Sequence, residues 1–234
     1  MGTERYYTLM ASLPALPALF EERRPPLSRF RLEERLRLLE PEDAHELKSL
    51  GRLMMWSRLS LEITNEEVVA MAEAVTREIR SPVLREVAEW RMELRTVVAA
   101  IRRRAAGEPP PAKNEIWGFG RWTRTLERNW AKSDFGLSGA LPWISDFNDR
   151  VERMDSLGFE KALLRLVWTY LSRKSEGHHF DFEAVALYAQ RWDVIHRWSM
   201  YDGAEAAKRF DELMQAAWGP YEDALDLAMN EGVV

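Results

Sequence analysis

Residues 82–106 read PVLREVAEWRMELRTVVAAIRRRAA and form the longest helical pattern in the chain. Pro82 is suited to the first turn of a helix, and Gly107 with the following prolines is suited to its end. At 1.5 Å per residue the predicted helix is roughly 37 Å long and spans the domain. One sector of its helical wheel is apolar and consists of Val83, Val87, Trp90, Leu94, Val97, Val98 and Ile101.

Arg91 lies at the edge of this apolar sector and needs an explanation. We expect it either to pair with a buried acid or to lie at a partner surface. An Arg91 that extends into free solvent would contradict both interpretations. Substitution by Met separates them, because a buried pair would lose stability and an interface arginine would lose partner affinity.

The rest of the chain also has helical periodicity, and no strand-period alternation is long enough to build a sheet. Ser28 and Asn65 are the expected N-caps of two helices. The sequence therefore predicts an all-α fold, a multi-helix orthogonal or bundle array with little or no β-sheet. The further predicted helices cover about 28–40, 41–59, 65–79, 121–132, 142–155, 158–174, 182–198, 203–217 and 220–230.

Three consecutive prolines make residues 108–120 the best candidate connector. The predicted organisation is an N-terminal helical region, 1–107, and a C-terminal helical region, 121–234, which could also pack as one domain. Tyr6 to Pro14 fit either a short helix or an extended docking strand, and the pattern leaves this open.

Composition limits the function. The 234 residues are 46% hydrophobic, enough for a continuous core, and the net charge of -5 argues against a general nucleic-acid binder. Without cysteine there is no disulfide, thiolate nucleophile or cysteine-ligated zinc, which suits a cytoplasmic protein. No apolar run approaches the roughly 18 residues that cross a bilayer, so membrane association would be peripheral. Phosphate-binding loops and the serine-hydrolase motif are also absent, and we expect no cofactor.

Two polar clusters could in principle hold a metal. His178, His179, Asp181 and Glu183 have poor ligand spacing, and we interpret them as a polar loop in which Asp181 caps the next helix. Asp146, Asp149 and Glu152 share a helix side, as in helical magnesium enzymes. Asp146 and Asp149 also stand four residues before Arg150 and Arg153, which favours a solvated, ion-paired face.

Arg102, Arg103 and Arg104 could contact an acidic partner or simply complement the negative end of their helix, and both interpretations stay open. Tryptophans suit both cores and interfaces, and the helical spacing of Trp90, Trp168 and Trp192 favours the core.

The stretch ELRTVVAAIRRRAAG, residues 93–107, resembles the helical rotor-adaptor family of V-type ATPases, which is designated C or d. Glu93, Arg102, Arg104 and Gly107 match that family's acid, two bases and helix-ending glycine, whereas Thr96 stands where the family has Asn. Proteins of the rotor-adaptor family are commonly longer and contain three related helical modules.

The whole chain resembles an uncharacterised bacterial family that is encoded among V-type ATPase subunits. The matching segments are Tyr6-Tyr7 to Leu13-Pro14, Phe182 to Tyr188, Arg191-Trp192, Arg197-Trp198 and Gly203.

This resemblance implies a non-catalytic adaptor that couples ATP hydrolysis or synthesis to ion transport. Its partners would be the central-stalk subunits and the membrane rotor ring, at the cytoplasmic side of the membrane, and a homodimer of the isolated chain is left open. The alternatives are a helical carboxylate-magnesium enzyme and a general helical interaction scaffold. The candidate interaction or structural residues are Tyr6, Tyr7, Arg91, Glu93, Arg95, Arg102, Arg104, Arg191, Trp192, Arg197 and Trp198.

Overall fold

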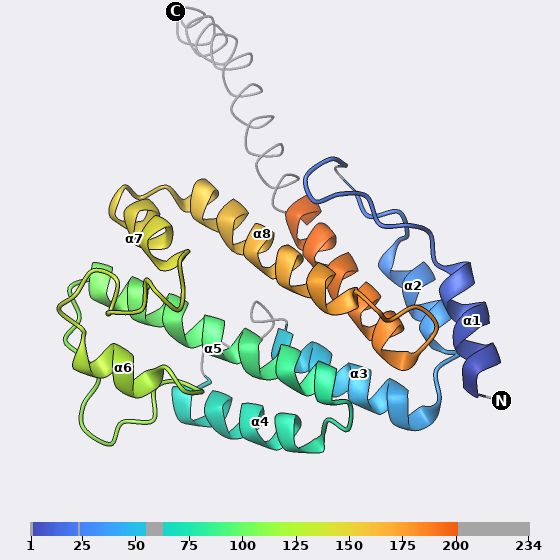
Figure 1. Ribbon diagram of the computed structural model, residues 1–234, viewed down its shortest axis with the longest axis horizontal. Helices are drawn as coiled ribbons and strands as arrows, with labels where there is room; N and C mark the ends of the chain where they lie inside the picture. The colour runs from blue at the N-terminus through green and yellow to red at the C-terminus, as the bar shows by residue number, and fades with distance from the viewer. Residues whose placement is uncertain (1, 23, 55–62, 201–234) are drawn as a thin grey trace, which may run out of the picture.

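The computed structural model describes residues 2–22, 24–54 and 63–200, and within them it contains helices and no strand (Figure 1). The all-α prediction is confirmed. The predicted helices over 203–217 and 220–230, and the end of the one over 41–59, lie outside the described residues. The helices are α1 (Gly2–Ser12), α2 (Arg29–Leu36), α3 (Pro41–Met54), α4 (Asn65–Glu78), α5 (Pro82–Ala105), α6 (Thr123–Arg128), α7 (Ile144–Glu152) and α8 (Ser156–Ser175), followed by an unlabelled helix over 182–200.

At the N-termini of α2 and α4, a side-chain hydroxyl accepts a hydrogen bond from a backbone N–H of the first helical turn. The Ser28 hydroxyl accepts a hydrogen bond from the N–H of Arg31 at 3.3 Å, as the sequence predicts for α2. The expected cap of α4 at Asn65 is wrong by one residue, because Thr64 occupies that position. Its hydroxyl accepts from the N–H of Glu67, and the Glu67 carboxylate accepts from the N–H of Thr64 in return. This reciprocal pair satisfies two backbone donors, whereas with Asn65 as the cap the third residue of the helix would be Val68, whose side chain cannot return the hydrogen bond.

The N-terminal segment is a helix, which settles the open alternative for Tyr6 to Pro14 in most of its length. Tyr6 and Leu9 are buried, and the Tyr6 hydroxyl donates a hydrogen bond to the Asp43 carboxylate at the start of α3. Tyr7 faces solvent and packs on Phe180, with ring centroids 4.7 Å apart. The first helix therefore contacts both α3 and the segment that precedes the helix over 182–200.

α5 forms the centre of the fold (Figure 1). It packs against α3, α4, α6 and α7, and Leu84, Val87 and Ile101 along it are fully buried. α8 runs alongside α5, and Trp90 of α5 stacks on Tyr170 of α8 with ring centroids 3.7 Å apart. Within the described ranges, every helix, α5 included, is too short or too polar to cross a bilayer.

One hydrophobic core runs through residues on both sides of the predicted connector, 108–120. The end of this segment lies on α5. The Thr96 hydroxyl accepts from the N–H of Phe119 at 2.8 Å and lies 3.0 Å from the Phe119 carbonyl. A Cβ atom at Gly118 would stand only 2.4 Å from Cγ2 of Thr96, so only glycine allows this approach. The connector is a loop held against the central helix.

The helices α6 and α7 are shorter than the sequence predicts. The Asn129 side-chain amide donates to the Thr125 carbonyl at 3.0 Å, a side-chain bond that competes with continuation of the helix. After α7, Met154 adopts a positive φ of 55°, which ends the helical backbone before Asp155 caps α8.

We predict that Thr96→Val destabilises the protein by about 1–3 kcal/mol, because the N–H of Phe119 loses its acceptor in a tightly packed loop. Thr76→Val is the matched control. Thr76 is also buried, but its hydroxyl only donates to carbonyls of its own helix, at 2.7 Å to Ala72. Urea unfolding of both variants measures the difference, and equal losses would contradict the role given to Thr96.

Candidate functional site

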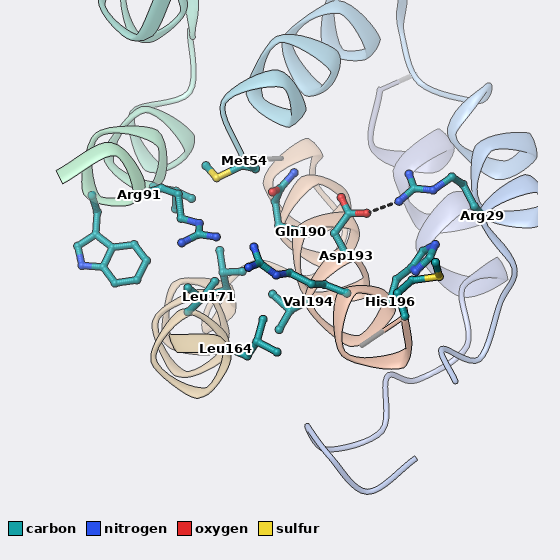
Figure 2. A pocket seen from close by; sticks show the side chains of 14 residues that line it. Arg29, Met54, Arg91, Leu164, Leu171, Gln190, Asp193, Val194 and His196 are labelled. Carbon is teal, nitrogen blue, oxygen red and sulfur yellow. Dashed lines mark hydrogen bonds and ion pairs between the residues drawn. The ribbon is translucent and has the colours of Figure 1, made fainter. Parts of the chain in front are cut away.

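A cleft of about 360 Å³ lies between α5, α8 and the helix over 182–200 (Figure 2). Its walls are mainly apolar and include Val87 and Trp90 from α5 and Leu164 and Leu171 from α8. Cavities of this size and character, with a few convergent polar groups, are typical of binding sites for small molecules. Arg29, Arg91 and Arg197 also line this cleft, together with Gln190, Asp193 and His196.

The Arg29 side chain enters from the start of α2 and is held by the helix over 182–200. Its Nη2 donates to the Asp193 carboxylate at 2.8 Å, the contact drawn as a dashed line in Figure 2. Its guanidinium group also lies 5.0 Å from the ring centroid of Trp192. This arrangement fixes α2 to the rim of the cleft.

Arg197 makes a two-point ion pair with Glu160 of α8. The Nε to Oε1 distance is 2.7 Å, and the Nη2 to Oε2 distance is 3.1 Å. The Glu160 side chain is only 12% exposed, whereas that of Arg197 is 37% exposed, so the acid is the more buried partner. Paired donors in this geometry are among the stronger polar contacts in proteins. The pair clamps the helix over 182–200 onto α8.

Arg91 is 6% exposed, and the case of an arginine extended into free solvent is therefore excluded. Burial lowers the pKa of Arg91 to about 9, and repulsion from Arg197 adds to that effect, whereas attraction to Glu160 opposes it. The sequence predicts that Arg91 either pairs with a buried acid or lies at a partner surface. Instead, Arg91 lines a cleft and is attracted to Glu160, which is itself paired with Arg197.

Gln190 is a polar wall residue that the sequence analysis missed. It is 5% exposed and is one of the side chains that line the cleft in Figure 2. A signal was present in the sequence: Ala186 and Val194, one turn before and one turn after it, are both apolar and buried. A glutamine in such a stripe is expected to face an interior.

The neighbouring candidates Arg191, Trp192 and Trp198 do not join this cleft. Arg191 lies near Trp168, 5.9 Å from its ring centroid, and burial lowers its pKa. Trp192 belongs to a separate small core and donates from its indole N–H to the Leu27 carbonyl at 3.0 Å. Trp198 packs edge-on against Phe20, with ring centroids 5.0 Å apart. Trp192 and Trp198 hold the N-terminal segment against the helix over 182–200, and Arg191 contacts α8.

The basic end of α5 contacts α7 and loops of its own chain. Arg103 pairs with Glu108 at 2.9 Å and with Glu115 at 3.4 Å. Arg104 donates to the Asn148 side-chain oxygen at 3.0 Å and to the Lys132 carbonyl. These bonds give the arginines a structural use besides the two that the sequence left open.

The remaining matches to the resemblance lie on the same helix. Arg102 stands over the ring of Phe159 at 5.0 Å from the centroid, and Glu93 accepts from the N–H of Arg121 at 3.2 Å. Arg95 is half-buried, and burial lowers its pKa.

The carboxylates proposed for magnesium lie on an exposed face. Asp146 and Arg150 form the predicted ion pair at 2.9 Å, and Arg150 also contacts Asp155 at 3.2 Å. The second predicted pair, Asp149 with Arg153, is wrong for the part of the chain that the structure covers. No described hydrogen bond or ion pair links Asp146, Asp149 and Glu152 to one another.

Asp181 caps the helix over 182–200, as the sequence predicts. One carboxylate oxygen accepts from the N–H of Ala184 at 2.8 Å, and the other lies 2.8 Å from Nδ1 of His178. Potential ligand atoms of His178, Asp181 and Glu183 lie within 4.8 Å of one another, yet both oxygens of Asp181 already have structural contacts.

Comparison with protein families gives one match. The family described as "Protein of unknown function (DUF2764)" matches residues 63–217, about two thirds of the chain. The chain belongs to the DUF2764 family. The DUF2764 match includes α5, α8 and residues 182–200, the three segments that form the main walls of the cleft. No curated protein and no solved structure matches the chain.

We predict that Glu160→Gln destabilises this DUF2764 protein by about 1–3 kcal/mol, because Arg197 loses its carboxylate partner and Arg91 loses an electrostatic attraction. The loss is smaller than for a fully buried pair, since the Arg197 side chain is 37% exposed. Glu42→Gln, at the exposed partner of Arg80, is the control and should cost no more than about 1 kcal/mol. Chemical denaturation gives both values.

The double variant Glu160→Gln with Arg91→Met should recover part of this loss, because removal of one cation relieves the repulsion. A double-variant loss equal to the sum of the two single losses would show that Arg91 and Glu160 do not interact.

Proposed function

We propose that the protein is a non-catalytic helical adaptor of a V-type rotary ATPase. In this proposal it contacts the central-stalk subunits and the membrane rotor ring from the cytoplasmic side. The resemblance of residues 93–107 and of the chain ends to V-type ATPase-associated families supports the assignment. The all-helical build agrees with it, because a coupling protein transmits force through stiff elements and requires no reactive group.

The observation that carries the proposal is the packing of α5 against other helices and against the loop that follows it. The stretch of residues 93–107 forms its second half, and α5 as a whole is packed by four other helices. Glu93 and Thr96 of this stretch hold the loop that follows, through contacts with Arg121 and Phe119. A helix braced in this way resists bending, which is the mechanical property that an adaptor needs.

The exposed ring pair of Tyr7 and Phe180 supports a role in protein association. Tyr7 is 58% exposed and Phe180 is 46% exposed, and the two rings pack on each other. Aromatic side chains are enriched at the energetic centres of interfaces. Tyr7 also belongs to the N-terminal segment on which the resemblance rests.

The carboxylates of the magnesium alternative receive no comparable support. Asp146 is paired with Arg150 at 2.9 Å, and Asp146, Asp149 and Glu152 are all exposed. We therefore do not propose catalysis at this face.

We predict that the tagged protein, purified from its native cells in mild detergent, carries V-type ATPase stalk subunits in fixed ratio. Mass spectrometry and native electrophoresis measure this. The double variant Tyr7→Ser with Phe180→Ser should reduce their recovery at least tenfold, because it removes the exposed aromatic pair.

Phe30→Ser is the matched control, since Phe30 is another exposed aromatic residue, on α2. It should leave recovery unchanged. A protein found in cells only as a free homodimer, with no stalk protein attached, would overturn the adaptor proposal.

A further inference from the structure

We propose that the cleft between α5, α8 and the helix over 182–200 binds a small organic carboxylate with an apolar body. The proposal goes beyond the adaptor function and does not depend on it. It is based on the charged and polar side chains that line the cleft and on its size.

The charge of the cleft favours an anion. Its walls bring Arg91 and Arg197 close enough for their guanidinium groups to repel each other. Glu160 engages Arg197 from the α8 side at 2.7 Å and attracts Arg91 as well. A ligand carboxylate placed against Arg91 would offset the repulsion and would match the flat geometry of a guanidinium group.

Gln190 supplies the second polar group. The residue is 5% exposed and lines the cleft, so its amide is a polar group in a mainly apolar wall. Polar groups in such surroundings usually form hydrogen bonds with protein, water or a ligand. The amide N–H can donate to one carboxylate oxygen while Arg91 binds the other.

The remaining wall selects an apolar body. Leu164, Val167, Leu171 and Val194 provide no hydrogen-bonding side chain, and neither do Met54 and Val87. The cavity of about 360 Å³ holds roughly a dozen units of water volume, at about 30 Å³ each. This is room for a carboxylate with about six to ten further heavy atoms. A more highly charged ligand, such as a phosphate ester, would leave charge against this apolar wall.

Two further titratable groups, Asp193 and His196, line the cleft and influence where in it an anion can bind. Asp193 is engaged by Arg29 at 2.8 Å and repels a second anionic group at that end. His196 lies on the same side (Figure 2). The carboxylate is therefore expected at the Arg91 end, with the apolar body along α8.

The test uses the purified full-length chain and octanoate as probe, with octanol as the uncharged comparison. Isothermal titration calorimetry and thermal unfolding should both detect octanoate, and octanol should bind at least tenfold more weakly. 3-Phenylpropionate and octanoate together distinguish an aromatic from a straight-chain body. Stronger binding of one of them identifies the class of metabolite.

Gln190→Leu removes the amide at nearly constant volume and should weaken octanoate at least tenfold without loss of stability. Arg91→Met should also weaken octanoate at least tenfold, and Gln190→Leu keeps the test decisive if Arg91→Met fails to fold. Arg77→Met, at an exposed arginine of α4, is the control and should leave affinity unchanged.

Three results would overturn the proposal. These are octanol binding as tightly as octanoate, unchanged affinity in Gln190→Leu, and no binding of either carboxylate to the folded wild-type chain.

Discussion

Burial of α5 is the constraint on which the rest of the structure depends. Its apolar side chains meet four helices and the core that continues past residue 120, so the other elements are arranged around it. Each fully buried aliphatic side chain contributes roughly 1.5–3 kcal/mol relative to exposure. Because this helix reaches solvent along only part of its length, the loops that follow must pack on it as well. The Thr96 contact with residue 119 is the most direct example.

Unlike the apolar surroundings of α5, the cleft contains several charged side chains among its apolar walls. Arg29, Arg91 and Arg197 lie at its walls, and the structure pairs Arg29 with Asp193 and Arg197 with Glu160 while Glu160 also attracts Arg91. An ion pair taken from water gives little net stability, because desolvation offsets much of the Coulomb attraction. Aliphatic residues would serve packing at least as well. The charged groups therefore require a reason other than stability, and ligand or partner recognition is one such reason.

Much of the fold could be read from the sequence, because helical periodicity and caps are local. Ser28 and the limits of α5 are examples in which cap, apolar stripe and helix end all agree. The cap expected at Asn65 is wrong by one position, since Thr64 and Glu67 satisfy each other in a way that a single-residue preference does not capture. The lengths of α6 and α7 depend on side-chain bonds and left-handed residues, such as Asn129 and Met154, which periodicity does not report.

The site is harder to predict, because it depends on distances between segments that are far apart in the sequence. Arg91 is recognisable as unusual from its own helix, whereas its relation to Arg197 and Glu160 emerges only when α5, α8 and the last described helix are assembled. Gln190 carries a weak local signal in its apolar stripe. The family match adds no function to either residue.

The close approach of Gly118 to Thr96 has a mechanical consequence. Because there is no space for even a methyl group between them, the loop cannot slide along α5 or rotate about it without first lifting away. Displacement of the central helix would therefore carry residues 118–121 with it. A segment without regular secondary structure thus moves together with the longest described helix. A force applied to the surface of this segment would be transmitted to the helix.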